Sequence, residues 1–216
     1  MYEKELINYF KEIALQSEYD SNPHKIIKWQ EPMMLYIKKE AEFKPQMSFI
    51  NKTICEVNRL ATDGFKIILT NELSKSNTIL YLCEKERIAD LNRQFYKALT
   101  DDIDYDFTGL AYSEFDTTTH IIDKALIFVS TEYDLDIQEV TILEEITQSL
   151  GLAFDSKSYT NSVFYYDKSE QGYKTKDYSN IDRDIIRLLY HPQMKPGFDS
   201  VEIEKVIRRI LESEKD

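Results

Sequence analysis

Residues 143–156 read LEEITQSLGLAFDS and concentrate the side chains that can do chemistry. Glu144 and Gln148 are four residues apart, so they share one face of a predicted helix, while Glu145 points about 100° away. Carboxylate and amide oxygens suit hard cations, and Asp155 follows the helix. One interpretation is therefore a calcium, magnesium or manganese ion held by Glu144, Gln148 and Asp155.

Two metal-free interpretations use the same residues. In the first, Glu145 and Asp155 flank a cleft as general base and acid, with burial raising the pKa of one of them. In the second, Gln148 bonds a carboxylate or a backbone group in a closed site, and Glu145 and Asp155 are structural. Neither interpretation needs a cofactor, and our default expectation is that the protein has no cofactor.

Tyrosines are concentrated just beyond this stretch. The chain has 15 tyrosines, and Tyr159, Tyr165 and Tyr166 follow the predicted helix closely. Tyrosine supplies contact area together with a polar group, so these residues could line a groove for a peptide or a glycan. Packing in the core is the alternative.

A second possible metal site lies upstream. Asp102, Asp104 and Asp106 are spaced like the start of a calcium-binding loop. Phe107 stands where the sharp turn requires glycine, and Ser113 stands where the bidentate glutamate belongs. An ordinary acidic turn is the alternative interpretation.

Composition excludes several classes of protein. The 216 residues carry a formal net charge of −12 and no basic cluster, which disfavours nucleic-acid binding. No apolar run is long enough to span a bilayer, and the first residues do not resemble a secretory signal, although a leader could have been removed. The three histidines are scattered, and a disulfide between Cys55 and Cys83 stays open.

Hydrophobic periodicity predicts the elements that position these residues. Helices are expected at 2–15, 46–61, 85–99, 136–151, 180–190 and 201–214. Strands are expected at 21–40 (interrupted or at an edge), 65–70, 77–84, 109–119 and 121–131. The helix at 136–151 should begin with a capping box from Asp136 to Glu139, end at Gly151 and bury Leu143 and Ile146.

The clustering of strands before this helix favours an α+β fold. We expect one domain over residues 1–216, with a strand-rich part at 1–135, the motif helix at 136–151, and a C-terminal loop and helices at 152–216.

The motif helix resembles the active-site helix of metzincin-type zinc peptidases, H-E-x-x-H-x-x-G-x-x-H. Glu145 and Gly151 match the general base and the turn glycine, whereas Glu144, Gln148 and Phe154 stand at the three ligand positions. The segment NSVFYYD is similar to the Ser-Val-Met-Tyr segment under the metal, with phenylalanine replacing methionine. The resemblance implies a zincin-like mixed sheet with a central active-site-type helix and C-terminal helices. It disfavours active zinc proteolysis, because a neutral amide is a feeble zinc ligand.

The segments LEEITQSLGL, RLLYHPQMKPG and EIALQSEY together resemble an uncharacterised family of bacterial secreted proteins and lipoproteins grouped with the zincin-like peptidases. That resemblance implies an extracytoplasmic protein, periplasmic or lipid-anchored, if a leader was removed. We predict a non-catalytic module of the cell envelope that holds an extended peptide or an envelope protein. The alternative is a peptidase-like hydrolase that uses Glu145 with Asp155, with or without a hard metal ion.

Overall fold

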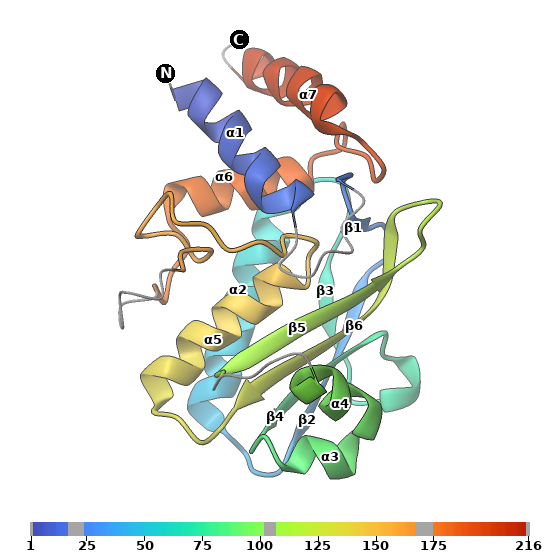
Figure 1. The fold of residues 1–216 in the computed structure, drawn as a ribbon, viewed down its shortest axis with the longest axis vertical. Helices are drawn as coiled ribbons and strands as arrows, with labels where there is room; N and C mark the ends of the chain where they lie inside the picture. The colour runs from blue at the N-terminus through green and yellow to red at the C-terminus, as the bar shows by residue number, and fades with distance from the viewer. Residues whose placement is uncertain (1, 17–23, 102–106, 167–174, 215–216) are drawn as a thin grey trace.

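The computed structural model describes residues 2–16, 24–101, 107–166 and 175–214. In these residues a six-stranded sheet has the order β1-β6-β4-β2-β3, and β5 pairs with β6 (Figure 1). All pairings are parallel except that of β5 with β6. The strands are β1 (Lys28–Trp29), β2 (Met33–Lys39), β3 (Ile67–Leu69), β4 (Thr78–Cys83), β5 (Gly109–Phe115) and β6 (Ile121–Ser130). The expected α+β class with a mixed sheet is confirmed.

Helices cover both faces of this sheet (Figure 1). They are α1 (Tyr2–Leu15), α2 (Lys44–Leu60), α3 (Arg87–Leu91), α4 (Arg93–Asp101), α5 (Leu135–Gln148), α6 (Asn180–Leu189) and α7 (Ser200–Ser213), with a 3₁₀ turn η1 (Leu73–Lys75). Helices α2 and α5 pack against each other on one face, and α3 and α4 lie on the other. Helix α1 packs against α6 and α7, so the two ends of the chain lie close together. No helix in the described ranges has the length and apolar character that a membrane span requires.

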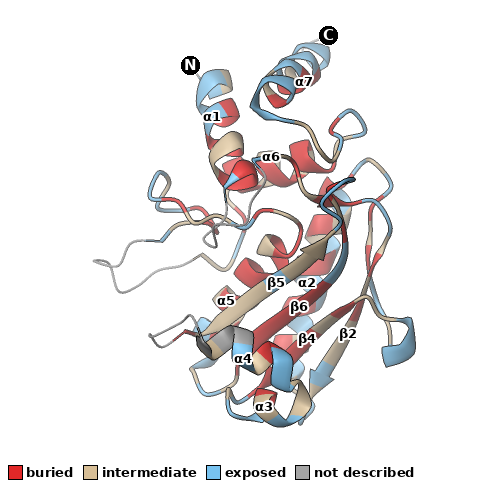
Figure 2. Ribbon diagram, turned by 45° about the vertical axis from the view of Figure 1, so that its right-hand side comes forward, coloured by how far each residue is buried: buried red, intermediate tan, exposed pale blue. Residues whose placement is uncertain are grey.

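The centre of the sheet is apolar because both of its faces are covered. Residues 125–129 of β6, ALIFV, are all buried (Figure 2). Alternate residues enter different clusters, since Ile127 packs toward α5 whereas Phe128 packs toward α3 and α4. A run that is buried on both faces is typical of a strand inside a parallel sheet.

Strand β5 is different, because it runs antiparallel at the edge of the sheet over α5. Gly109 is required where the two elements meet, since a Cβ there would lie 2.3 Å from Thr141 Cγ2 and 2.7 Å from the Phe128 carbonyl oxygen. The Ser130 N–H donates to Thr108 O, so Thr108 and Ser130 form a hydrogen-bonded pair of the antiparallel ladder. Every second residue of β5 from Thr108 onward, the even-numbered ones, therefore bonds to β6. The backbone N–H and C=O groups of Ala111 and its odd-numbered neighbours therefore point away from β6.

Two predicted elements need correction. Within the range predicted at 21–40, the described residues form two strands, β1 and β2, as expected of an interrupted strand, but β2 lies between β3 and β4 and is not an edge strand. The single helix predicted at 85–99 is two helices, because Asn92 Oδ1 accepts the Phe95 N–H at 3.0 Å and so begins α4.

The predicted capping box of the motif helix is also wrong. Helix α5 begins at Leu135, and its N-cap, Asp134, makes no side-chain capping bond. Asp136 and Glu139 instead bind Lys176, which lies far along the chain. Complete capping boxes begin two other helices. Ser179 and Asp182 form the one at α6, and Asp199 and Glu202 form the one at α7.

Candidate functional site

Helix α5 carries three of the predicted site residues, Glu144, Glu145 and Gln148, and its two glutamates face inward. Only 4% of Glu144 and 6% of Glu145 is exposed, whereas Gln148 is half-buried. The predicted core residues Leu143 and Ile146 are buried as expected. The two carboxylates of the motif therefore lie in the interior of the molecule and not on an open cleft wall.

Gln148 and Asp155 come together in the structure. The Gln148 amide Nε2 donates to Asp155 Oδ1 at 3.0 Å across the turn that ends α5. Two of the three proposed metal ligands are therefore joined directly to each other. Such a bond is the arrangement expected if Gln148 satisfies a carboxylate and does not coordinate a cation.

Glu145, the proposed general base, lies under the edge strand. A Cβ on Gly109 would stand 3.0 Å from Glu145 Cγ, so the β5 backbone packs directly on this side chain. Ser113, four residues further along β5, has its Oγ 3.5 Å from Ser149 O at the end of the helix. The strand thus covers the face of α5 that carries Glu145.

The turn after α5 is fixed by residues distant in sequence. Gly151 has φ +100°, and a Cβ there would lie 2.0 Å from the Ile27 carbonyl oxygen. Trp29 Nε1 donates to Ser149 O at 2.9 Å, and the Tyr190 hydroxyl donates to Leu150 O at 2.9 Å. These contacts anchor the end of the helix to β1 and to the end of α6, and so set the path of the chain into Asp155.

The segment beyond the turn folds back on itself. Ser156 pairs with Tyr165, with the Ser156 N–H donating to Phe164 O at 2.7 Å and the Tyr166 N–H donating to Ser156 O at 3.0 Å. This pairing brings Asp155 beside the tyrosine segment, as a groove would require. Tyr165 is half-buried and Tyr166 is 37% exposed.

Tyr159 lies apart from those two tyrosines. Its ring packs edge-on against the ring of Tyr9 on α1, with a centroid distance of 4.6 Å. Tyr159 therefore supports the packing of α1, whereas Tyr165 and Tyr166 remain beside Asp155.

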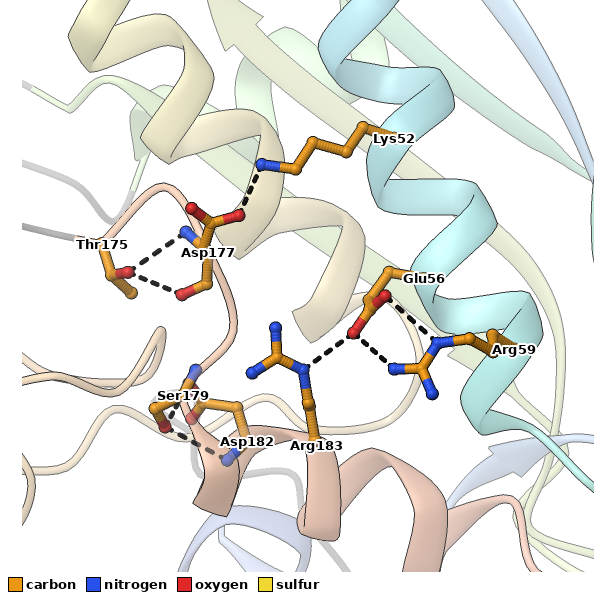
Figure 3. Close-up of polar contacts among 8 residues, drawn as sticks. All are labelled: Lys52, Glu56, Arg59, Thr175, Asp177, Ser179, Asp182 and Arg183. Atoms are coloured by element: carbon orange, nitrogen blue, oxygen red, sulfur yellow. Dashed lines mark hydrogen bonds and ion pairs between the residues drawn. The ribbon is translucent and has the colours of Figure 1, made fainter.

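A buried carboxylate that the sequence analysis did not single out holds this segment against α6. Asp182 has no exposed surface and accepts from the Ser162 hydroxyl at 2.6 Å and the Val163 N–H at 3.2 Å. It also accepts from the Ser179 N–H at 2.8 Å, at the start of α6 (Figure 3). Tyr9 in turn donates to Ser162 Oγ at 2.8 Å. Burial raises the pKa of Asp182, although the hydrogen bonds it accepts act in the opposite direction. The Ser179-x-x-Asp182 pattern could have indicated a helix start, but nothing in it shows the contact with Ser162.

A buried cation is the second polar feature absent from the sequence analysis. Lys28 on β1 donates to Asp63 Oδ2 at 2.7 Å and to Leu189 O at 2.6 Å, and its Nζ lies 4.8 Å from the ring centroid of Tyr190. Burial lowers the pKa of Lys28, and Asp63 opposes that effect. A cation at the last carbonyls of α6 stabilises the end of that helix.

The donors available for a metal are few. Among the described residues, no three His, Cys, Asp or Glu side chains converge as a metal site. Cys55 is exposed and Cys83 buried, and both thiols are free. Asp102, Asp104 and Asp106, the possible calcium loop, lie outside the described residues.

The fold and this site define an α+β protein in which an edge strand covers a helix with buried carboxylates. Residues 3–209 match the family described as "Protein of unknown function (DUF2927)". The match covers nearly the whole chain, so the protein belongs to this family. No curated protein matches the chain.

Proposed function

We propose that this protein is a non-catalytic, zincin-like module of the bacterial cell envelope that holds an extended peptide along the free edge of β5. The zincin comparison is supported by the arrangement of α5, which follows β6, lies under an antiparallel edge strand and is followed by a turn with a glycine of positive φ. Val163 and Phe164, in the segment similar to the one under the metal of such enzymes, are buried in the core beside α5.

The observation that carries the non-catalytic part is the closure of the motif by the chain itself. Glu144 and Glu145 are 4% and 6% exposed, and Gln148 is bonded to Asp155. A general base must come within hydrogen-bond reach of the proton it removes, and Glu145 is covered by β5 at Gly109. This geometry favours the structural role of Glu145 over the hydrolase alternative.

The peptide-holding part rests on the edge of β5. The outward N–H and C=O groups of Ala111 and its odd-numbered neighbours offer a template for an added strand. Tyr112 is 48% exposed on this strand and can contribute side-chain contact. Tyr165 and Tyr166 supply further aromatic surface beside Asp155, on the segment that follows α5.

Selection of random, proline-free decapeptides on the immobilised protein tests this proposal. Synthetic copies of the enriched sequences should bind wild type, and Ala111→Pro should weaken binding at least about tenfold because it removes an outward N–H. Ala111→Gly keeps that N–H and is the matched control, expected to bind within about twofold of wild type.

Two outcomes would contradict peptide addition at β5. One is the absence of any enriched sequence, and the other is equal binding of the enriched peptides by Ala111→Pro and wild type. Thermal melting of both variants checks that the strand remains folded.

Placement in the envelope is supported by the resemblance to secreted proteins and lipoproteins. Fractionation of cells that make the full-length protein should recover it in the periplasmic or membrane fraction. Recovery with cytoplasmic markers alone would contradict this placement.

A further inference from the structure

A small cleft lies between α2, α5 and the segment that leads into α6, away from the edge of β5. Its volume is about 100 Å³, and its floor includes Phe49 and Leu143. Lys52, Glu56 and Arg183 stand around it, and Figure 3 shows these side chains converging from α2 and α6. Apolar and charged side chains both line the cleft, so a ligand there can bury carbon atoms while its polar group is oriented by the charged residues.

One nitrogen of the Arg183 guanidinium is hydrogen-bonded to the protein, and its two terminal nitrogens can donate to a ligand. Its Nε donates to Glu56 Oε1 at 2.8 Å, and within the described residues no hydrogen bond is found for its two terminal nitrogens. Glu56 also accepts from Arg59 at 2.8 Å. Arg59 and then Arg183 hold the pKa of Glu56 below its ordinary value, so this carboxylate stays ionised and orients the Arg183 guanidinium. A positioned guanidinium is well suited to bind a carboxylate with two parallel hydrogen bonds.

Thr53 supplies an independent observation. Its side chain lines the same cleft and is 2% exposed, and its hydroxyl oxygen is buried with no hydrogen-bond partner in the described part of the chain. A buried hydroxyl without a partner is costly, and such groups are rare in native proteins. An acceptor atom of a ligand in the cleft would satisfy it.

The balance of charge selects the kind of ligand. Lys52 is already paired with Asp177, and Lys176 with two carboxylates of α5. Arg183, in contrast, shares the single carboxylate of Glu56 with Arg59, which leaves one positive charge in excess beside Arg183. A single negative charge neutralises that excess, whereas the volume admits only a few carbon atoms beside it. We propose that the cleft binds a short aliphatic monocarboxylate, with its carboxylate on Arg183 and Thr53 and its hydrocarbon over Phe49 and Leu143.

Titration of the protein with sodium butyrate at constant ionic strength, followed by amide chemical shifts, tests this proposal. The shifts should saturate with a dissociation constant on the order of 1 mM and should map to α2, α5 and α6. Butyramide has the same shape without the charge and should bind at least about tenfold more weakly.

Two variants and a matched control locate the carboxylate. Arg183→Lys and Thr53→Val should each weaken butyrate binding about tenfold. Arg209→Lys makes the same exchange at an exposed position of α7 and should leave binding unchanged. Thr53→Val should also have an unchanged or higher Tm, because it removes a buried hydroxyl without a partner.

Several results would overturn the proposal. These are a lack of saturable shifts, equal binding of butyramide and butyrate, or wild-type affinity in both cleft variants. A lower Tm for Thr53→Val would show that the hydroxyl has a protein partner, which would remove the second observation.

Discussion

The two sides of α5 differ in how far the chain itself covers them. On the side toward β5 and the following turn, Gln148 is bonded to Asp155, and Glu145 is covered by the edge strand. On the side toward α2, Leu143 borders a cleft. There the Thr53 hydroxyl and the terminal nitrogens of Arg183 have no hydrogen-bond partner among the described residues. The side that resembles an active site is therefore closed, and the side without a recognisable motif is open.

The largest effect is expected at the turn that closes the first side. Gly151→Ala should cost more than about 3 kcal/mol of unfolding free energy or prevent folding, because its Cβ would overlap the Ile27 carbonyl oxygen. Gly64→Ala is the matched control, since Gly64 has φ +101° with no atom within 4 Å and should lose only about 1 kcal/mol. Denaturant titration gives both values, and similar losses would mean that the contact with Ile27 is not a constraint.

Loss of core packing under α5 should come next. Ile146→Ala should cost about 2–5 kcal/mol because Ile146 is fully buried. Ile137→Ala, at an exposed position of the same helix, should change stability by less than about 0.5 kcal/mol. If the two variants unfold at the same denaturant concentration, the assigned inner face of α5 is incorrect.

Asp182→Asn should cost about 2–3 kcal/mol at neutral pH, because the amide cannot accept all the bonds now made to the carboxylate. The folded protein binds the Asp182 proton more readily than the unfolded chain, since burial raises this pKa above its ordinary value of 3.8. The stabilising contribution of protonation is therefore complete below 3.8 and is lost as the pH rises through the raised pKa. The stability difference between wild type and Asp182→Asn should consequently widen as the pH falls through that window.

A difference that is constant with pH would show that the pKa of Asp182 is the same in the folded and unfolded chain. Asp184→Asn exchanges the same groups two residues later on α6, outside the Ser162 network, and is the control for this pH series.

The smallest changes in unfolding free energy are expected for single polar groups on the two sides of α5. Gln148→Ala should lose about 0.5–1.5 kcal/mol through its bond to Asp155, and Asp155→Ala should add little further loss in the double variant. Thr53→Val, on the other side, should lose nothing. Fully additive losses for Gln148→Ala and Asp155→Ala would show that the two side chains do not act together, and would weaken the contrast.

The sequence predicted much of the fold because helix periodicity and glycine chemistry act locally. Helix α5 begins within one residue of its expected start but ends at Gln148, three residues before the predicted end. Gly151 has the expected positive φ, in the turn that follows the helix. The order of the strands and the mainly parallel pairing could not be predicted, since they depend on contacts between distant segments. The capping box from Asp136 to Glu139 failed for the same reason, because Lys176 binds both carboxylates from far along the chain.

The candidate site was predictable in part. The sequence analysis offered a carboxylate or a backbone group as the partner of Gln148, and the structure identifies the carboxylate of Asp155 as that partner. The bonds of Asp182 to Ser162 and of Lys28 to Asp63 join residues 20 and 35 positions apart and carry no local pattern. The cleft lined by Thr53 could not be predicted from the sequence either, because it forms only where α2, α5 and the segment leading into α6 meet.

Elemental analysis tests the closure of the motif most directly. Wild type, Glu144→Ala and Gln148→Ala would be dialysed against zinc, manganese, calcium and magnesium and then analysed for bound metal. We predict less than about 0.1 equivalent of any metal above buffer in all three proteins, because Glu144 is buried and Gln148 is already bonded to Asp155. One equivalent in wild type that disappears in both variants would contradict the account and would restore the metal-dependent hydrolase as the leading hypothesis.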